Sequence, residues 1–399
     1  MKLAVVAAGF TPGEADQLRR AMGAWRKTGV IEKFQEKLLQ GMREKGLSDE
    51  FADQVFRQIR GFGEYGFPES HAASFAVLVY ISAWLKRYFP AAFCASVINS
   101  HPMGFYAPAQ LVADARSHGV NVRPVDINHS NWDCTLEGNP GGRNREARAG
   151  SEQANGQPLS WPDLRLGFRL ISGLRQDAGL AIERAREKGP FVSMVDFANR
   201  TGLGQATLSR LSQADAFGSL QQDRRASLWQ ALAQSPTPQD QPLFDTLDPE
   251  DSEPVHLPEL SAEQQVADDY QSIGLSLRAH PISFYREQLN ELKVTPTAEL
   301  KSMENNRHLR VAGLVILRQR PSTANGITFV TMEDETGTAN LVVKQQVWER
   351  YYQVARQSQA WIAHGKLEKK NGVIHLVVNR LEDLSSRLGE LKFQSRDFR

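Results

Sequence analysis

Cysteine is scarce in this sequence of 399 residues, because Cys94 and Cys134 are the only two. Two thiols cannot build a disulfide framework or a zinc ribbon with four cysteines, and their scarcity fits a reducing cytoplasm. No apolar run is long enough to cross a membrane. The apolar stretch at residues 3–8 is too short for a signal peptide, and Glu14 and Asp16 follow it closely. We therefore expect a cytoplasmic protein with no membrane partner.

Net charge is also nearly absent, since 47 Lys and Arg oppose 46 Asp and Glu. The neutral total hides a local asymmetry. Residues 226–277 contain ten acids and no Lys or Arg, so this segment carries −10 and the remainder of the chain +11. A salt-sensitive site for a polyanion can lie on either side of the acidic segment. The alternative is a protein-interaction scaffold that uses the acidic segment itself.

Paired carboxylates of the kind that hold two metal ions are missing. Asp114, Asp126, Asp133 and the acids at 333–335 show no paired-carboxylate strand signature. Two-metal phosphoryl transfer needs carboxylates that clamp both ions. We therefore expect no catalytic residue, no metal ligand and no bound cofactor in this chain.

The pattern of apolar residues predicts a multidomain α+β protein. Residues 11–125 are mostly helical, and the nearly all-apolar helix at 72–88 is expected to be buried on most sides. Strands near 132–136 and 164–167 are expected to pair. The expected domains are 1–125, 126–233 with a disordered loop at 137–159, an acidic linker at 234–262, a helical connector at 263–306, a barrel at 307–385 and a tail at 386–399.

From Arg310 onward the apolar period changes from helical spacing to two. Five short strands are expected, with a helix at 345–355 between the third and the fourth. This order is the pattern of an OB-fold, a five-stranded β-barrel. The strands are expected at residues 311–317, 326–332, 339–343, 360–367 and 372–378.

Glycine breaks between the helices of 168–220 indicate a helix-hairpin-helix region. Such a hairpin uses a Gly-hydrophobic-Gly turn to direct backbone N–H groups at a DNA phosphate. Gly173 and Leu174 supply the first two positions, and Arg175 stands where the second glycine is expected. Either Arg175 replaces the backbone contact with charge, or the unit is purely structural.

The barrel segment combines cations with aromatic residues. Cations beside exposed rings suit single-stranded nucleic acid, because phosphates follow the charge and bases stack on the rings. The alternative is that the aromatic residues, Trp348, Tyr351 and Trp361 among them, form the core. The candidate DNA-binding residues of the barrel are Arg318, Arg320, Phe329, Lys344, Lys366, Lys369 and Lys370.

Two further groups carry possible phosphate-binding chemistry near the N-terminus. The cations Arg19, Arg20, Arg26 and Lys27 gather within nine residues, as phosphate ligands or as a solvated helix face. The pair Ser70-His71 begins a helix, where N–H groups favour an anion. The structural alternative is an N-capping serine beside a hydrogen-bonded loop histidine. The residues by themselves favour this alternative over an anion site.

A short apolar pair, Leu243-Phe244, lies inside the acidic linker. Such a pair on an extended segment can insert into a groove of a partner protein.

Several longer strings resemble the bacterial C-family DNA polymerases, and most of all their error-prone, damage-inducible branch. They are YGFPESHAASFA at 65–76, SAWLK at 82–86, MGFY at 103–106, KGPF at 188–191, GLSL at 274–277 and FVTMEDETG at 329–337. The resemblance covers nearly the whole chain outside 137–159. It implies the C-terminal part of such an enzyme, from the fingers to the OB domain.

The resemblance implies roles for the candidate residues. Arg19, Arg20, Arg26, Lys27 and the Ser70-His71 pair would lie in finger segments near the incoming nucleotide and template. Residues 168–220 would grip duplex DNA, the barrel would hold single strands, and Leu243-Phe244 lies where replicative relatives carry a sliding-clamp motif. The palm, which carries the acids that hold Mg²⁺ in that family, precedes these motifs and is not recognised in this sequence.

We therefore expect the C-terminal portion of an error-prone DNA polymerase for damage-induced translesion synthesis. The full enzyme would be a nucleotidyltransferase with DNA, deoxynucleoside triphosphates, and a sliding clamp or other mutagenesis proteins as partners. This chain alone is expected to bind DNA and nucleotide but to lack activity. The alternative is a non-catalytic DNA-binding module made of the hairpins and the barrel.

Overall fold

The computed structural model forms two compact units, Met1–Leu85 and Lys86–Arg399. It describes residues 2–23, 34–65, 69–102, 106–138, 161–233, 257–321, 324, 326–370, 372–385 and 396–398.

The first unit is helical, as the sequence predicts. Its core is built by the first four helices, with Leu18, Leu38 and Met42 almost fully buried. Ser48 caps the fourth helix, because its Oγ accepts a hydrogen bond of 3.3 Å from the N–H of Phe51. The helices are α1 (Lys2–Ala8), α2 (Pro12–Gly23), α3 (Gln35–Glu44), α4 (Asp49–Tyr65) and α5 (Glu69–Tyr88).

Helix α5 lies where the sequence predicts it, but it is exposed where burial was expected. The expectation that it is buried on most sides is wrong for the described residues, because every side chain from His71 to Leu85 is exposed. An apolar helix is buried only where other elements offer apolar faces to it. The core of this unit takes residues from α1 to α4 and none from α5. Within the described residues, no helix is both long and apolar enough to span a membrane.

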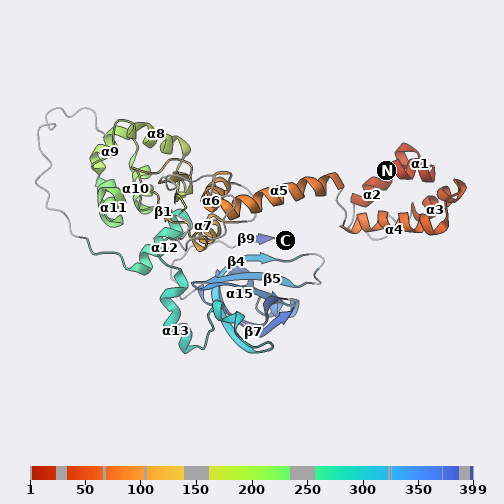
Figure 1. Ribbon diagram of the computed structural model, residues 1–399. Helices are drawn as coiled ribbons and strands as arrows, with labels where there is room; N and C mark the ends of the chain where they lie inside the picture. The colour runs from red at the N-terminus through yellow and green to blue at the C-terminus, as the bar shows by residue number, and fades with distance from the viewer. Residues whose placement is uncertain are drawn as a thin grey trace, which may run out of the picture. The chain divides into compact units, whose positions relative to one another are not determined.

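The hairpin region, residues 119–233, surrounds a continuous apolar core with Phe168, Ile182, Phe197 and Phe217 fully buried. Two helices precede it, and a small sheet enters the same core. The expected pairing of the strands near 135 and 164 is confirmed, since Leu136 lies opposite Leu164 in antiparallel register. Figure 1 shows α8 to α11 gathered in one cluster. The elements are α6 (Pro90–Asn99), α7 (Pro108–Ser117), β1 (Val122–Arg123), β2 (Thr135–Glu137), β3 (Asp163–Arg165), η3 (Phe168–Leu170), α8 (Gln176–Arg186), α9 (Met194–Thr201), α10 (Gln205–Gln213), η4 (Gly218–Leu220) and α11 (Arg224–Ala233).

A connector of short helices joins this region to the barrel. Ser261 caps α12 through the N–H of Gln264, and α12 packs against α10 and η6. Buried Asp269 accepts hydrogen bonds from both Arg224 and Arg278, so ion pairs fix α12 to the hairpin region. The connector elements are α12 (Ala262–Ile273), η6 (Pro281–Tyr285), α13 (Arg286–Glu291) and η7 (Thr297–Lys301).

The predicted barrel is confirmed, with its five strands in the order β5-β6-β8-β7-β4 and closed by pairing of β4 with β5. Two glycines allow the strands to approach closely. A Cβ on Gly313 would lie 2.5 Å from the carbonyl oxygen of Glu333, and one on Gly365 would lie 2.4 Å from that of Val377. The strands are β4 (His308–Gln319), β5 (Thr328–Asp334), β6 (Gly337–Val343), β7 (Ala360–Lys370) and β8 (Val373–Asp383).

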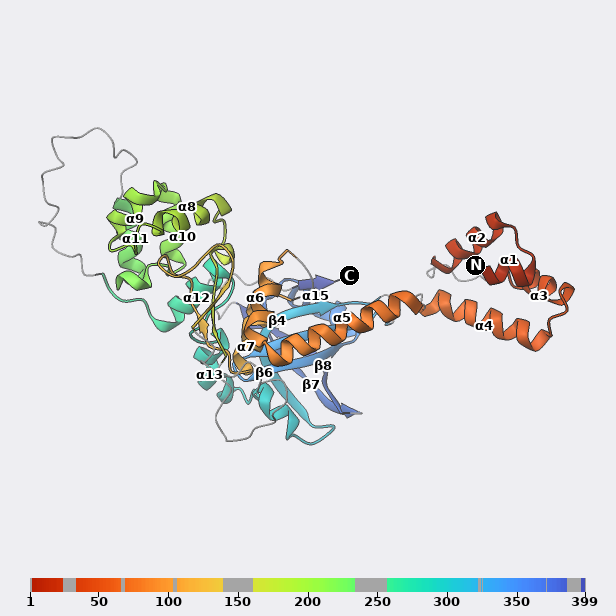
Figure 2. The same cartoon turned by 45° about the horizontal axis from the view of Figure 1, so that its top comes forward.

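A helical segment stands between the third and fourth strands, as expected, but it consists of two helices, α14 (Gln345–Arg350) and α15 (Tyr352–Gln357), rather than one. Figure 2 shows β4, β6, β7 and β8 wrapped around the barrel with α15 beside them. A short strand, β9 (Arg396–Phe398), adds in parallel to residues Leu317–Gln319 of β4. The barrel core includes Val311, Met332 and Trp361.

Candidate nucleic-acid interface

The predicted hairpin lies between η3 and α8. Gly173 has a φ of +72°, a left-handed conformation that side chains rarely adopt, and Leu174 next to it is buried. Arg175 then occupies the N-cap position of α8, with 80% of its side chain exposed and an ion pair of 2.5 Å to Asp177. The turn therefore presents both a glycine and an exposed cation to solvent.

A second hairpin lies between α9 and α10, and the sequence analysis did not single it out. Gly202 ends α9 in the left-handed conformation with a φ of +64°, and Gly204 is the N-cap residue of α10. Leu203 between them packs against the core. Gly202-Leu203-Gly204 keeps both glycines of the Gly-hydrophobic-Gly pattern, so the string itself was a sufficient signal. Both hairpins are exposed at their glycines.

The arginines of this region differ in what they contact. Arg186 donates to the carbonyls of Ile127 and Ser130, and Arg200 donates to three carbonyls and to Asp196. These two side chains hold the fold together. Arg210, by contrast, lies against Gly173 of the first hairpin and has no hydrogen bond or ion pair to any residue that the structure describes. Its charge is available to a ligand.

Strand register places one row of outward-facing residues around the barrel. Phe329 of β5 lies opposite Gln319 and Val342, Val342 lies opposite Val377, and Val377 lies opposite Lys366. Phe329 is 41% exposed and Lys366 is half-buried. An exposed ring and a lysine thus share one face of the barrel, as a surface for a single strand requires.

Arg318 lies inside the barrel wall and is 5% exposed. Its guanidinium stacks over Trp361 at 5.2 Å from the ring centroid, and it donates to the carbonyl of Ser358. The core alternative for the aromatic residues holds for Trp361, which is fully buried, and in part for Trp348 and Tyr351.

The other cations of the barrel lie at its edges. Arg320 follows β4 and is exposed, and exposed Lys344 is the N-cap residue of α14. Exposed Lys370 ends β7, whereas Lys369 donates from Nζ to the carbonyl of Lys301 at 2.7 Å. Contact of these residues with DNA remains a prediction.

Four of the N-terminal candidates lie in two helices of the first unit. Arg19 and Arg20 lie in α2, and their side chains are not described. Ser70 and His71 lie in the first turn of α5, where the exposed His71 ring lies 4.4 Å from the ring of Phe75. Two pairs of candidates, Arg26-Lys27 and Leu243-Phe244, fall outside the described residues, as do residues 139–159 of the loop predicted at 137–159. Glu137, the first residue of that predicted loop, belongs to β2.

A buried cluster of charges joins the connector to the barrel. Asp334 accepts hydrogen bonds from Thr297 and from Thr336, which outweigh its burial and lower its pKa. Arg286 contacts Asp334 at 3.2 Å and Glu335 at 2.5 Å. Burial raises the pKa of neighbouring Glu333 to about 6.

His280 precedes η6 in the same junction. Its Nδ1 accepts a hydrogen bond of 3.2 Å from the N–H of Ile282, and its buried Nε2 has no partner among the described residues. Burial lowers the pKa of His280 to about 4, so the ring is neutral near pH 7.

Three segments of the chain match known protein families. Residues 1–46 match the finger domain of the bacterial DNA polymerase III alpha subunit. Residues 119–227 match a helix-hairpin-helix motif, and residues 309–384 match an OB-fold nucleic-acid-binding domain. The second and third matches coincide with the hairpin region and the barrel.

Curated relatives match the chain along its whole length. An error-prone DNA polymerase of Rhodopirellula baltica is 54% identical, one of Methylococcus capsulatus 48% and one of Sinorhizobium medicae 47%. The chain spans 33%, 38% and 36% of these relatives, respectively. Among solved structures, an asparaginyl-tRNA synthetase of Pyrococcus horikoshii aligns over 23% of each chain with 21% identity, and its TM-score of 0.21 carries no argument.

Proposed function

The chain belongs, as a segment, to the bacterial error-prone DNA polymerases, and on this premise we propose that it supplies the part of such an enzyme that holds DNA. The observation that carries the proposal is the exposed Gly202-Leu203-Gly204 hairpin within a chain that is 54% identical to an error-prone DNA polymerase. The hairpins would bind duplex, and the barrel would bind the single strand.

Duplex binding would rest on backbone N–H groups. At the start of α10 the first N–H groups have no acceptor four residues earlier, and the helix dipole adds partial positive charge. Gly204 leaves this end open, because nothing lies within 4 Å of the position that a Cβ would occupy. A phosphate can approach such an end without reading the base sequence. Arg175 and Arg210 at the first hairpin would add charge.

Single-strand binding would use the outer row of the barrel. Bases would stack on Phe329, while Lys366 and the edge cations Arg320, Lys344 and Lys370 would follow the phosphates. Arg318 would act indirectly, because its guanidinium is buried over Trp361. In the whole enzyme this surface would hold the template during translesion synthesis in the cytoplasm.

Nucleotidyl transfer belongs to the proposal only for the whole enzyme. The finger segment, with Arg19, Arg20, Arg26, Lys27, Ser70 and His71, would contact the incoming deoxynucleoside triphosphate. Among the residues that the structure describes, no group of three or more His, Cys, Asp or Glu is placed to hold an ion, and Mg²⁺ belongs to the proposal only for the whole enzyme. We derive no step through the metal and expect no primer extension by this chain alone. Clamp binding through Leu243-Phe244 is likewise proposed only for the whole enzyme.

Gly204→Asp tests the hairpin without endangering the fold. The backbone at Gly204 is extended, with φ −73° and ψ 159°, as an N-cap requires, so the new carboxylate caps α10 and stabilises it. The same carboxylate occupies the N–H groups and repels phosphate. We expect duplex affinity, measured by fluorescence anisotropy, to fall by about tenfold or more.

Ser193→Asp is the matched control, because it adds the same charge at the N-cap of α9, away from the hairpin turn. It should change duplex affinity by less than about threefold. Equal affinity of Gly204→Asp and the unaltered chain for duplex would refute the proposed hairpin contact.

A further inference from the structure

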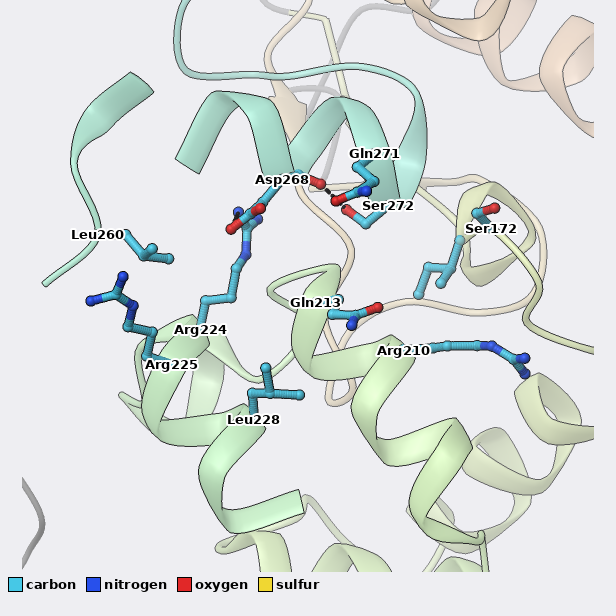
Figure 3. A pocket seen from close by; sticks show the side chains of 11 residues that line it. Ser172, Arg210, Gln213, Arg224, Arg225, Leu228, Leu260, Asp268, Gln271 and Ser272 are labelled. Atoms are coloured by element: carbon cyan, nitrogen blue, oxygen red, sulfur yellow. Dashed lines mark hydrogen bonds and ion pairs between the residues drawn. The ribbon is translucent and has the colours of Figure 1, made fainter. Parts of the chain in front are cut away.

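A half-open pocket of about 350 Å³ lies between α10, α11 and α12, beside the first hairpin. Its volume is in the range of small-ligand sites. Figure 3 shows Arg224 reaching from α11 toward Asp268 on α12, while Arg210 and Arg225 stand on opposite sides of the pocket. The contacts agree with this placement: Arg225 donates a hydrogen bond to the carbonyl of Pro258, and the Arg210 side chain lies beside Gly173.

The pocket carries excess positive charge. Three arginines line it, against one carboxylate, that of Asp268. Arg224 is 6% exposed and forms ion pairs with Asp268 and Asp269, yet its buried Nε has no hydrogen-bond partner among the described residues. A buried donor without a partner indicates a group that a ligand or water can satisfy.

The middle of the pocket is polar and uncharged. The side chains of Gln213, Gln271 and Ser172 line it and make no hydrogen bond within the part of the chain that the structure describes. Leu228, Leu260 and Ile171 supply apolar wall between them. A ligand that fits has an anionic group at each end, and a body between them with hydrogen-bonding edges and an apolar face.

We propose that this pocket binds one nucleotide unit with a phosphate on both its 5′ and 3′ sides. Arg210 takes one phosphate and Arg225 the other, because these cations stand at opposite sides. The base lies between them, against Leu228, with its edge toward Gln213 and Gln271. The proposal extends the proposed DNA-holding function to a single unpaired nucleotide beside the first hairpin. It is separable from that function through Arg225, which lines the pocket and takes no part in the proposed duplex contact.

The minimal probe is thymidine 3′,5′-bisphosphate, compared with thymidine 5′-monophosphate and inorganic phosphate by isothermal titration calorimetry on the full chain. We expect the bisphosphate to bind at least about tenfold more tightly than the monophosphate, since each charged contact contributes on that scale. Arg210→Ala and Arg225→Ala should each lower bisphosphate affinity to about that of the monophosphate. Arg210 is exposed and makes no contact with other charges, so its removal leaves the fold intact.

Arg184→Ala is the control, because Arg184 is exposed on α8 outside the pocket and should leave all three affinities unchanged. Equal affinities for bisphosphate and monophosphate would overturn the proposal, as would arginine variants that bind the bisphosphate normally. An oligothymidylate that loses affinity in the same two variants identifies a strand as the source of the nucleotide. If the two variants lose affinity for the bisphosphate but not for the oligothymidylate, the strand is excluded as the source and the ligand is a free nucleotide. If the unaltered chain binds duplex only weakly but binds the bisphosphate as expected, the hairpin function is refuted and the pocket proposal stands.

Discussion

The hairpin region and the barrel use similar cations in different ways. Arg210 of the hairpin region is exposed and has no partner among the described residues, whereas Arg318 of the barrel is 5% exposed and lies over Trp361. The hairpin region offers backbone N–H groups with arginines beside them. The barrel offers an exposed ring, Phe329, in the same outer row as Lys366. A count of cations therefore does not locate a binding surface, because burial decides which charges remain available to a ligand.

The largest effect is expected from Asp334→Ala, which tests whether the hairpin region and the barrel are stable independently. Asp334→Ala removes a fully buried carboxylate and leaves the N–H groups of Thr297, Thr336 and Gly337 without their acceptor, while Arg286 keeps Glu335. Each donor left without a partner costs about 1–3 kcal/mol, so the sum exceeds about 3 kcal/mol. Hydrogen exchange should show the barrel amides losing protection while the hairpin amides keep it.

Asp383→Ala is the control, since exposed Asp383 accepts only a local hydrogen bond from the N–H of Ser385. It should cost less than about 1 kcal/mol. Equal loss of protection in both regions with Asp334→Ala would show that they unfold as one cooperative unit and not independently.

The second prediction concerns pH at the junction of the two regions. The pKa of His280 is about 4 in the fold and 6.5 when unfolded, so protonation favours the unfolded state. Its stabilising contribution is complete above pH 6.5 and is lost as the pH falls to 4. It amounts to about 3 kcal/mol at most.

His280→Asn keeps an acceptor for the N–H of Ile282 but does not titrate, so its stability should fall less across this range. Glu333, whose pKa is raised to about 6, acts in the opposite sense in both proteins and cancels in the difference. Urea unfolding at pH 7, 5.5 and 4 measures the effect. Parallel pH profiles for the two proteins would contradict the neutral, buried state of His280.

The third prediction separates the two regions by ligand. Phe329→Ala should weaken single-strand binding by about 1–3 kcal/mol, the cost of losing one stacked base, and leave duplex binding unchanged. Fluorescence anisotropy with labelled oligothymidylate and labelled duplex measures both. Tyr352→Ala removes an exposed ring of α15 outside the outer row and should change neither affinity. Equal losses for single strand and duplex would contradict a division of labour between barrel and hairpins.

The smallest expected effect compares the two hairpins. Arg175→Gly gives the first hairpin the glycine pattern of the second and removes one cation. If Arg175 contacts one phosphate, the slope of log affinity against log salt for duplex should become shallower by about 1. Arg175→Lys keeps the charge and should keep the slope. An unchanged slope with Arg175→Gly would favour the purely structural alternative for this hairpin.

Local patterns were sufficient for much of the fold. The alternation of apolar residues predicted all five strands of the barrel and the helical segment before the fourth, and Ser261 marked the start of α12. The helix at 72–88 was predicted in position and missed in burial, because burial depends on what other elements offer to it. Gly202-Leu203-Gly204 follows the Gly-hydrophobic-Gly pattern in the sequence itself, so the second hairpin is predictable from local sequence as well.

The sequence by itself determined most elements and their order along the chain, and the resemblance to a polymerase family, because apolar periodicity, glycine position and long shared strings are properties of the chain read in order. Only the tertiary structure decided which cations are available. Arg210 and Arg225 line one pocket from α10 and α11, and there Arg224 pairs with Asp268 of α12. Arg318 lies on Trp361, which is far away in sequence. Charge becomes a binding site only when packing determines its partners and its exposure.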